Sequence, residues 1–134
     1  MSPIDPSNPK FLHAIYQVRN LFSGKWVPAI AIVLLPGPLH YKDLLHGVRA
    51  LDVATDRPNL LHEAVLTRTL RRMVENQLLV RKEKPSAFAP SVSYALTPAT
   101  RHALKAAMPL VEWLETHPEL NKWTVSRPAG LIAR

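Results

Sequence analysis

Apolar positions along this 134-residue chain recur mainly at helical spacing, and prolines separate the helical stretches from one another. Apolar residues three or four positions apart predict a first helix over residues 10–22. A denser apolar run predicts a second helix that begins near residue 25 and reaches Leu35, with Ser23 as its candidate N-cap. The segment Pro36–Pro38 then ends this helix, because proline cannot continue the helical hydrogen bonding.

The centre of the chain contains the clearest helical pattern. A very short strand at residues 39–40 and a short helix over residues 41–48 are predicted first. A loop of mixed charge follows over residues 49–60, with one helical turn within it left open. Residues 61–77 then form an amphipathic helix. Its apolar face consists of Leu66, Leu70, Met73 and Val74. Its opposite face carries Arg68, Arg71, Arg72 and Glu75.

The hydrophobic period changes from helical to alternating after this helix. Two strands within residues 78–96, joined by the tip Pro85–Ser91, predict a β-hairpin. A last helix is expected over residues 97–117, because Thr97 is a favourable N-cap and a proline follows it at the first helical position. This helix is expected to bend at Pro109.

This order of elements is that of a winged helix-turn-helix domain. We expect a mainly α fold with a small β-hairpin (α+β class), with about five helices and a two- to three-stranded wing sheet. The single domain is expected to span residues 1–134, with the helix-turn-helix region at 25–77, the wing at 78–96 and a tail at 118–134. In such a domain the basic helix can enter a DNA major groove about 12 Å wide while the hairpin reaches phosphates.

Charge and composition narrow the class of partner. Lys and Arg outnumber Asp and Glu by 17 to 10, and the formal net charge of +7 favours a polyanion. Residues 67–84 alone hold six basic and two acidic side chains. The chain has no cysteine, which excludes disulfides, thiolate zinc sites and thiol redox sensing. We expect a cytoplasmic protein without a membrane partner, because no export signal is visible and the longest apolar run is too short for a bilayer.

Several segments resemble motifs of the HxlR-type transcriptional regulators, a group within the MarR-like superfamily. Leu21–Trp26 is similar to the glycine-lysine-tryptophan motif of that family, and Trp113 falls where the family often has a tryptophan. The segments that resemble its glycine-rich turn, recognition-helix core, first wing strand and wing exit are Pro36–Leu44, Leu66–Arg71, Leu78–Arg81 and Pro90–Pro98. The resemblance implies a bacterial-type winged-helix regulator that binds double-stranded DNA.

The chain departs from this family pattern at several positions. Family members often have a cysteine near the N-terminus, which some use to sense oxidants, and this chain has none. Gln77 and Thr100 stand where the family has glycines, and Ser93 replaces a glutamate. The loop at residues 49–60 is longer than is usual in the family. The family's recognition-helix orientation and operator sequence therefore cannot be carried over to this chain.

The arginines of the amphipathic helix are the leading candidates for DNA contact. Arg68 lies early on the outward face and is the best candidate for a base edge, whereas Arg71 could brace the fold or hold a phosphate. On an arbitrary helix, a solvated basic face would be the simpler interpretation. The other candidates are Arg72, Thr67, His62, Lys25, His40, Lys82 and Lys84. Lys82 and Lys84 are equally well explained as strand-edge lysines that discourage edge pairing.

The first and last predicted helices favour self-association, because both are amphipathic. We expect a homodimer, since two DNA half-sites one helical turn apart require two recognition helices. The candidate interface residues are Phe11, Ile15, Val18, Leu110, Trp113 and Leu114.

No other chemistry is indicated by the sequence. The six histidines are scattered without a metal-ligand spacing, and no phosphate loop, nucleophile elbow or carboxylate pair is present, so neither a cofactor nor an enzyme is expected. Two alternatives stay open: a winged-helix module that binds protein, and a regulator whose DNA affinity is switched by an unknown small molecule. A steep loss of affinity with salt would favour DNA over an apolar protein interface.

Overall fold

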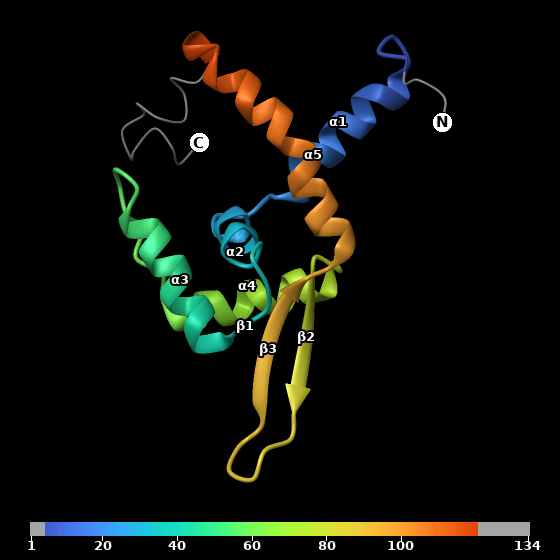
Figure 1. The fold of residues 1–134 in the computed structure, drawn as a ribbon. Coiled ribbons are helices and arrows are strands. Elements are labelled where there is room, and N and C mark those ends of the chain that lie inside the picture. Colours follow the sequence, from blue (N-terminus) through green and yellow to red (C-terminus); the bar gives the residue numbers. More distant parts are fainter. Residues whose placement is uncertain (1–4, 121–134) are drawn as a thin grey trace.

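The computed structural model describes residues 5–120, and over that range it combines helices with a small antiparallel sheet (Figure 1). In chain order the elements are α1 (Pro9–Leu21), α2 (Val27–Val33), β1 (Leu39–His40), α3 (Tyr41–Val53), α4 (Glu63–Glu75), β2 (Leu79–Lys84), β3 (Ser91–Leu96) and α5 (Pro98–Glu115). The predicted α+β fold, including the very short first strand, is confirmed. Within the described residues, no helix is both long enough and apolar enough to span a membrane.

The hydrophobic core lies where α2, α3 and α4 meet the base of the sheet. Its fully buried side chains are Ile30, Leu34, Leu44, Val48, Leu66, Leu70 and Met73. Those from α4 include most of the apolar face predicted for this helix, so burial of that face fixes the rotation of α4 about its axis. The buried hydrophobic residues of the described chain all lie between Trp26 and Leu96.

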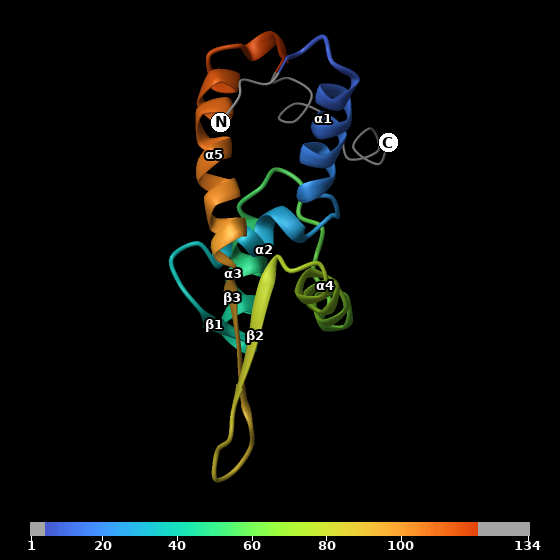
Figure 2. The ribbon, with the colours of Figure 1, turned by 90° about the vertical axis from the view of Figure 1, so that its right-hand side faces the viewer.

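The three strands pair in the order β1-β3-β2. The hairpin register runs from Leu79 opposite Leu96 to Lys84 opposite Ser91, and the six residues 85–90 form its tip. β1 pairs with β3, with Leu39 opposite Tyr94. Because α3 begins directly after β1, this pairing ties the helix-turn-helix region to the wing. The wing projects from one end of the body (Figure 1, Figure 2).

Helices α1 and α5 project from the body at the end opposite the wing (Figure 1, Figure 2). α1 is capped by Asn8, whose side chain accepts a hydrogen bond from the Lys10 N–H, and it has no buried residue. α5 is capped by Thr97 as predicted, and Thr100 is its one buried residue. Pro109 lies inside α5 and leaves one backbone hydrogen bond unmade, which separates the packed first half from the projecting second half. We call α1 and the second half of α5 the arms.

Two local predictions are wrong. Ser23 is not the cap of α2, because that helix begins at Val27 and its N-cap residue is Trp26, which makes no side-chain capping bond. The predicted loop over residues 49–60 begins too early, since α3 continues to Val53. Residues 49–53 stay helical because Asp52 is buried and its carboxylate has backbone partners further along the chain. Most of the predicted tail, residues 121–134, lies outside the described residues.

Candidate nucleic-acid interface

The outward face of α4 is strongly basic. With Leu66, Leu70 and Met73 buried, the opposite side of the helix is exposed to solvent. The exposed residues of α4 are Glu63, Ala64, Thr67, Arg68, Arg71, Arg72 and Glu75. None of the three arginines makes a hydrogen bond or ion pair within the described residues, so their guanidinium groups are available to an external anion.

The segment between α3 and α4 is held by Asp52. The two carboxylate oxygens of Asp52 accept hydrogen bonds from the Asn59 N–H at 2.9 and 3.0 Å, and one of them also accepts from the Leu60 N–H at 2.9 Å. Leu60 has a φ of 57°, a left-handed conformation that costs energy for a residue other than glycine. Asp52 therefore fixes a strained turn immediately before the exposed helix.

Arg49 provides a second clamp on the same segment. Its Nε and one terminal nitrogen donate to the carbonyl oxygen of Leu61 at 3.1 and 3.0 Å. Sequence reasoning missed both Arg49 and Asp52, because it treated residues 49–60 as a loop. The signal that could have revealed them is the absence of glycine and proline between residues 48 and 57, which allows a helix to continue.

Tyr41, at the start of α3, fixes the N-terminal turn of α4. Its hydroxyl donates to the carbonyl oxygen of Glu63 at 3.2 Å, and it also lies 3.2 Å from the Thr67 hydroxyl. Thr67, a predicted DNA contact, is thus exposed but already has an intramolecular partner. His62, another predicted contact, is the exposed N-cap residue of α4 and its side chain makes no capping bond.

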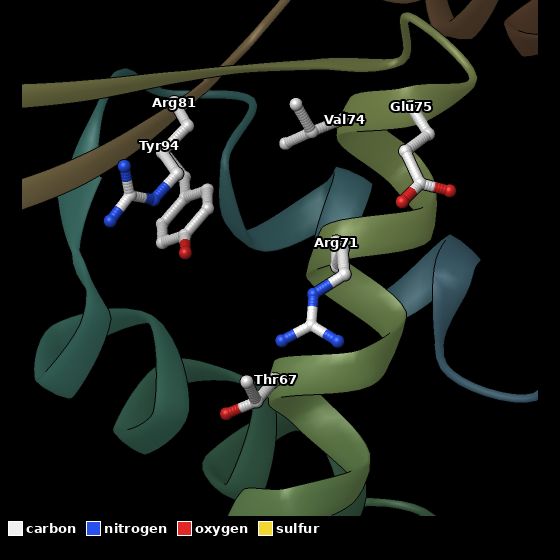
Figure 3. Close-up of a pocket in the computed structure, with 6 residues that line it drawn as sticks. All are labelled: Thr67, Arg71, Val74, Glu75, Arg81 and Tyr94. Atoms are coloured by element: carbon white, nitrogen blue, oxygen red, sulfur yellow. The ribbon is translucent and has the colours of Figure 1, made fainter.

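A cleft of about 270 Å³ separates α4 from the wing (Figure 3). Thr67, Arg71, Val74 and Glu75 line it from α4, and Arg81 and Tyr94 line it from β2 and β3. Arg81 and Tyr94 face each other across the two strands. The Tyr94 hydroxyl, followed by the Glu83 carboxylate at 3.2 Å, raises the pKa of the Arg81 guanidinium above its already high usual value. Arg81 thus places a guanidinium group on the wing side of the cleft, paired with Glu83 and opposite Arg71.

Arg81 is a site residue that sequence reasoning did not select. Its place opposite Tyr94 depends on the strand register, which pairs Arg81 with Tyr94 and Lys82 with Ser93. Lys82 and Lys84, the two predicted phosphate contacts of the wing, are both exposed. Arg81 thus lies across the cleft from Arg71 of α4, whereas Lys82 and Lys84 alternate with Arg81 along β2 and belong to the other face of the hairpin.

Lys25 comes before α2 and lies outside α4 and the wing, whereas His40 belongs to the wing sheet, where it pairs with Ser93. Lys25 precedes α2, which lies on the arm side of α4 in Figure 1, and its ammonium lies 5.9 Å from the centre of the Trp26 ring. The Nδ1 atom of His40 lies 3.3 Å from the Val92 carbonyl oxygen and 3.2 Å from the Ser91 hydroxyl. His40 therefore braces β1 against β3, a role that the sequence did not indicate.

The predicted dimer residues lie on the two arms. Ile15, Val18, Leu110 and Trp113 are 48%, 62%, 60% and 45% exposed, and Phe11 and Leu114 are half-buried. The Trp113 ring stacks on His117 with 4.2 Å between ring centres. So much exposed apolar surface on two projecting helices is unusual for a monomer. Among residues 5–120, no group of three or more histidine, aspartate and glutamate side chains lies close enough together to hold a metal ion.

The order of the elements and the β1-β3-β2 sheet define a winged-helix fold. No protein-family model and no curated protein matches the chain. Among solved structures, it is similar to a protein from Enterococcus faecalis assigned to the MarR family of transcriptional regulators, with a TM-score of 0.68 and 22% identity over 90% of this chain and 97% of that one. It is also similar to the redox regulator HypR in its reduced form, with a TM-score of 0.61 and 17% identity over 81% and 97% of the two chains.

A third similar structure is a PadR family transcription regulator from Clostridium difficile, with a TM-score of 0.50 and 21% identity over 70% of this chain and 94% of that one. These likenesses confirm the predicted winged-helix fold at low sequence identity. The HxlR-type resemblance stays a prediction.

Proposed function

We propose that this protein is a transcriptional regulator that binds double-stranded DNA in a sequence-specific manner as a homodimer. The observation that carries the proposal is the exposed face of α4, where Arg68, Arg71 and Arg72 have no hydrogen-bond or ion-pair partner among residues 5–120, beside a basic wing. The proposal includes the HxlR-type resemblance, a bacterial-type cytoplasmic setting, and no enzymatic activity or cofactor.

The mechanism follows from the arrangement of α4 and the wing. α4 enters the major groove, where Arg68 can donate two hydrogen bonds to a guanine edge. Lys82, Lys84 and Arg81 on the wing neutralise phosphates, and Arg71 faces the same backbone from the other side of the cleft. Asp52 and Arg49 act through the turn that they hold, because they fix where α4 starts.

Dimerisation through the arms is supported by their position and their surface. The arms lie at the end of the body opposite the wing, so pairing between them leaves both α4 helices uncovered (Figure 1). A two-fold axis through the arms would present two copies of α4 to two half-sites of an inverted repeat.

The test is selection of random duplex DNA by the purified protein, followed by fluorescence anisotropy on the enriched pool across a salt series. We expect an enriched inverted repeat and a steep negative dependence of log affinity on log salt concentration. Absence of enrichment together with salt-insensitive binding to proteins would contradict the proposal and favour a winged-helix protein-interaction module.

Replacing Arg68 by alanine is expected to weaken binding to the enriched duplex by about 1–3 kcal/mol and to relax the preference at one base pair per half-site. The reason is that a bidentate contact to a guanine edge discriminates against other bases. Anisotropy with duplexes substituted at each position measures both effects. Lys105→Ala in the first half of α5 is the matched control, because it removes an exposed cation outside both α4 and the arms. Equal effects of the two changes would mean that α4 is not the reader.

Replacing Lys84 by alanine is expected to weaken binding to all duplexes alike and to make the salt slope shallower by about one unit. A phosphate contact carries no sequence information, so the base preference of the enriched pool should be unchanged. Comparison of the salt slopes of the wild-type protein and the variant on specific and random duplexes measures this. An unchanged slope would indicate that Lys84 only protects the strand edge.

A further inference from the structure

The tip of the wing carries an exposed aromatic side chain. Phe88 is 99% exposed, the highest value among the large hydrophobic residues of the described chain. It lies in the middle of the tip Pro85–Pro90, which consists of proline, alanine, serine and this phenylalanine. Every residue of the tip is exposed. Phe88 therefore contributes nothing to the core.

The tip presents Phe88 in a restricted conformation. Pro85 and Pro90 fix the backbone φ angle at both ends of the tip, and the Phe88 N–H donates to the Ser86 hydroxyl at 3.3 Å. Strand pairing continues up to Lys84 and Ser91, directly below these prolines. Little conformational entropy is lost when such a tip binds a partner, because much of it is restricted beforehand.

The surroundings of Phe88 favour a polyanion as the partner. The stem below it carries Arg81, Lys82 and Lys84 against the single acidic residue Glu83. No Asp or Glu occurs from residue 84 to residue 111, so the side chains around the tip add no negative charge. A lone exposed apolar residue is common on proteins, but one that stands at the end of a basic hairpin beside a basic helix is suited to nucleic acid.

The reach of the hairpin matches the spacing of DNA grooves. Arg81 lines the cleft against α4, and the strand continues for three residues to Lys84 before the tip begins. At about 3.3 Å per residue, Phe88 extends roughly 10–20 Å beyond Arg81. Successive major and minor grooves are centred about 17 Å apart, half of a helical turn of about 34 Å. With α4 in a major groove, the tip reaches the adjacent minor groove.

We propose that Phe88 is an apolar wedge that enters the minor groove next to the half-site and partly unstacks one base step. This inference rests on the proposed DNA-binding function. Apolar wedges of this kind kink DNA toward the major groove, which brings more of the duplex against the protein. Flexible pyrimidine–purine steps should be favoured at that position, although no side chain reads their base edges.

The experiment uses the full chain and the enriched duplex with 2-aminopurine placed, in turn, at adenine positions flanking each half-site. Bound wild-type protein is expected to raise the fluorescence several-fold at one step per half-site, because unstacking relieves quenching. Phe88→Ala is expected to abolish the rise and to bind roughly ten- to hundredfold more weakly. Its salt slope should be unchanged, since no charge is lost. Phe88→Leu should keep part of the rise, and Ala89→Ser, a control at the same tip, should keep all of it.

The possible outcomes separate this inference from the function on which it rests. Duplex binding by the wild-type protein with no fluorescence change at any flanking step would overturn the wedge and leave the proposed function intact. A change in oligomeric state for Phe88→Ala, with unaltered DNA binding, would also overturn it, because Phe88 would then contact a second copy of the chain. Failure of the wild-type protein to bind any duplex would overturn both.

Discussion

Replacing Trp113 by alanine is expected to weaken the proposed homodimer by about 4 kcal/mol, roughly a thousandfold in the dissociation constant. Truncation of a central interface aromatic commonly costs about 2 kcal/mol, and a two-fold interface contains the residue twice. Trp113 is suited to this role because it is 45% exposed on the projecting half of α5 and its ring is held by stacking on His117. Operator binding should fall with dimerisation, while binding of a single half-site should not.

Sedimentation velocity across a protein concentration series measures the dissociation constant, and circular dichroism checks that the fold is retained. Glu112→Gln is the matched control, because Glu112 is an exposed polar neighbour on the same helix. An unchanged dimer in Trp113→Ala would show that the second half of α5 is not the interface.

Replacing Asp52 by alanine is expected to lower the free energy of unfolding by about 2–3 kcal/mol. The change removes the acceptor of two backbone N–H groups, those of Asn59 and Leu60, and releases the left-handed turn at Leu60. Asn59 and Leu60 are exposed, so water can replace part of the lost hydrogen bonding. The free-energy cost is therefore smaller than for two N–H groups left unpaired in the core. Operator affinity should also fall, because α4 begins only three residues after Leu60.

Urea unfolding followed by circular dichroism measures the loss of stability. Asp56→Ala is the control, since Asp56 is an exposed carboxylate in the same segment and should change the stability by less than about 0.5 kcal/mol. If Asp52→Ala and Asp56→Ala were equally stable, the carboxylate of Asp52 would have no special part in holding the turn.

The course of the fold could be predicted from the sequence because its periodicities are strong. The face of α4 follows from the spacing of Leu66, Leu70 and Met73, and the wing follows from the strand alternation that ends at Leu96. Thr97 followed by proline marks the start of α5 with a known capping mechanism. These signals are local, so one sequence is enough to detect them.

The contacts that define the candidate site could not be predicted in the same way. The pairing of Arg81 with Tyr94 depends on strand register, and the hold of Asp52 on Leu60 depends on how far α3 continues. Mixed charge and a proline at residue 58 suggested a loop, whereas burial of Asp52 keeps α3 helical to Val53. Gln77, which stands where the resembled family has glycine, does adopt the left-handed conformation, with a φ of 63°. The family pattern thus indicated the backbone geometry there although the residue type differs.

The amino-acid composition shows that the similarity to a redox regulator does not extend to thiol chemistry. HypR is named as a redox regulator, but this chain has no cysteine. A thiol switch cannot therefore be transferred along with the fold. Any control of the proposed DNA binding must act through other chemistry, such as a ligand or a change in protein concentration.

The separation between the core and the arms has an evolutionary consequence. Because the core lies between Trp26 and Leu96, substitutions on α1 or on the second half of α5 leave the hydrophobic core untouched. If the proposed function is correct, the arms of one copy could acquire a new pairing preference after a gene duplication while α4 kept the same DNA sequence preference. The reverse change is equally accessible, since the exposed positions of α4 are not used for packing. Under the proposed function, the partner chosen by the arms and the DNA sequence preferred by α4 could therefore change independently of each other.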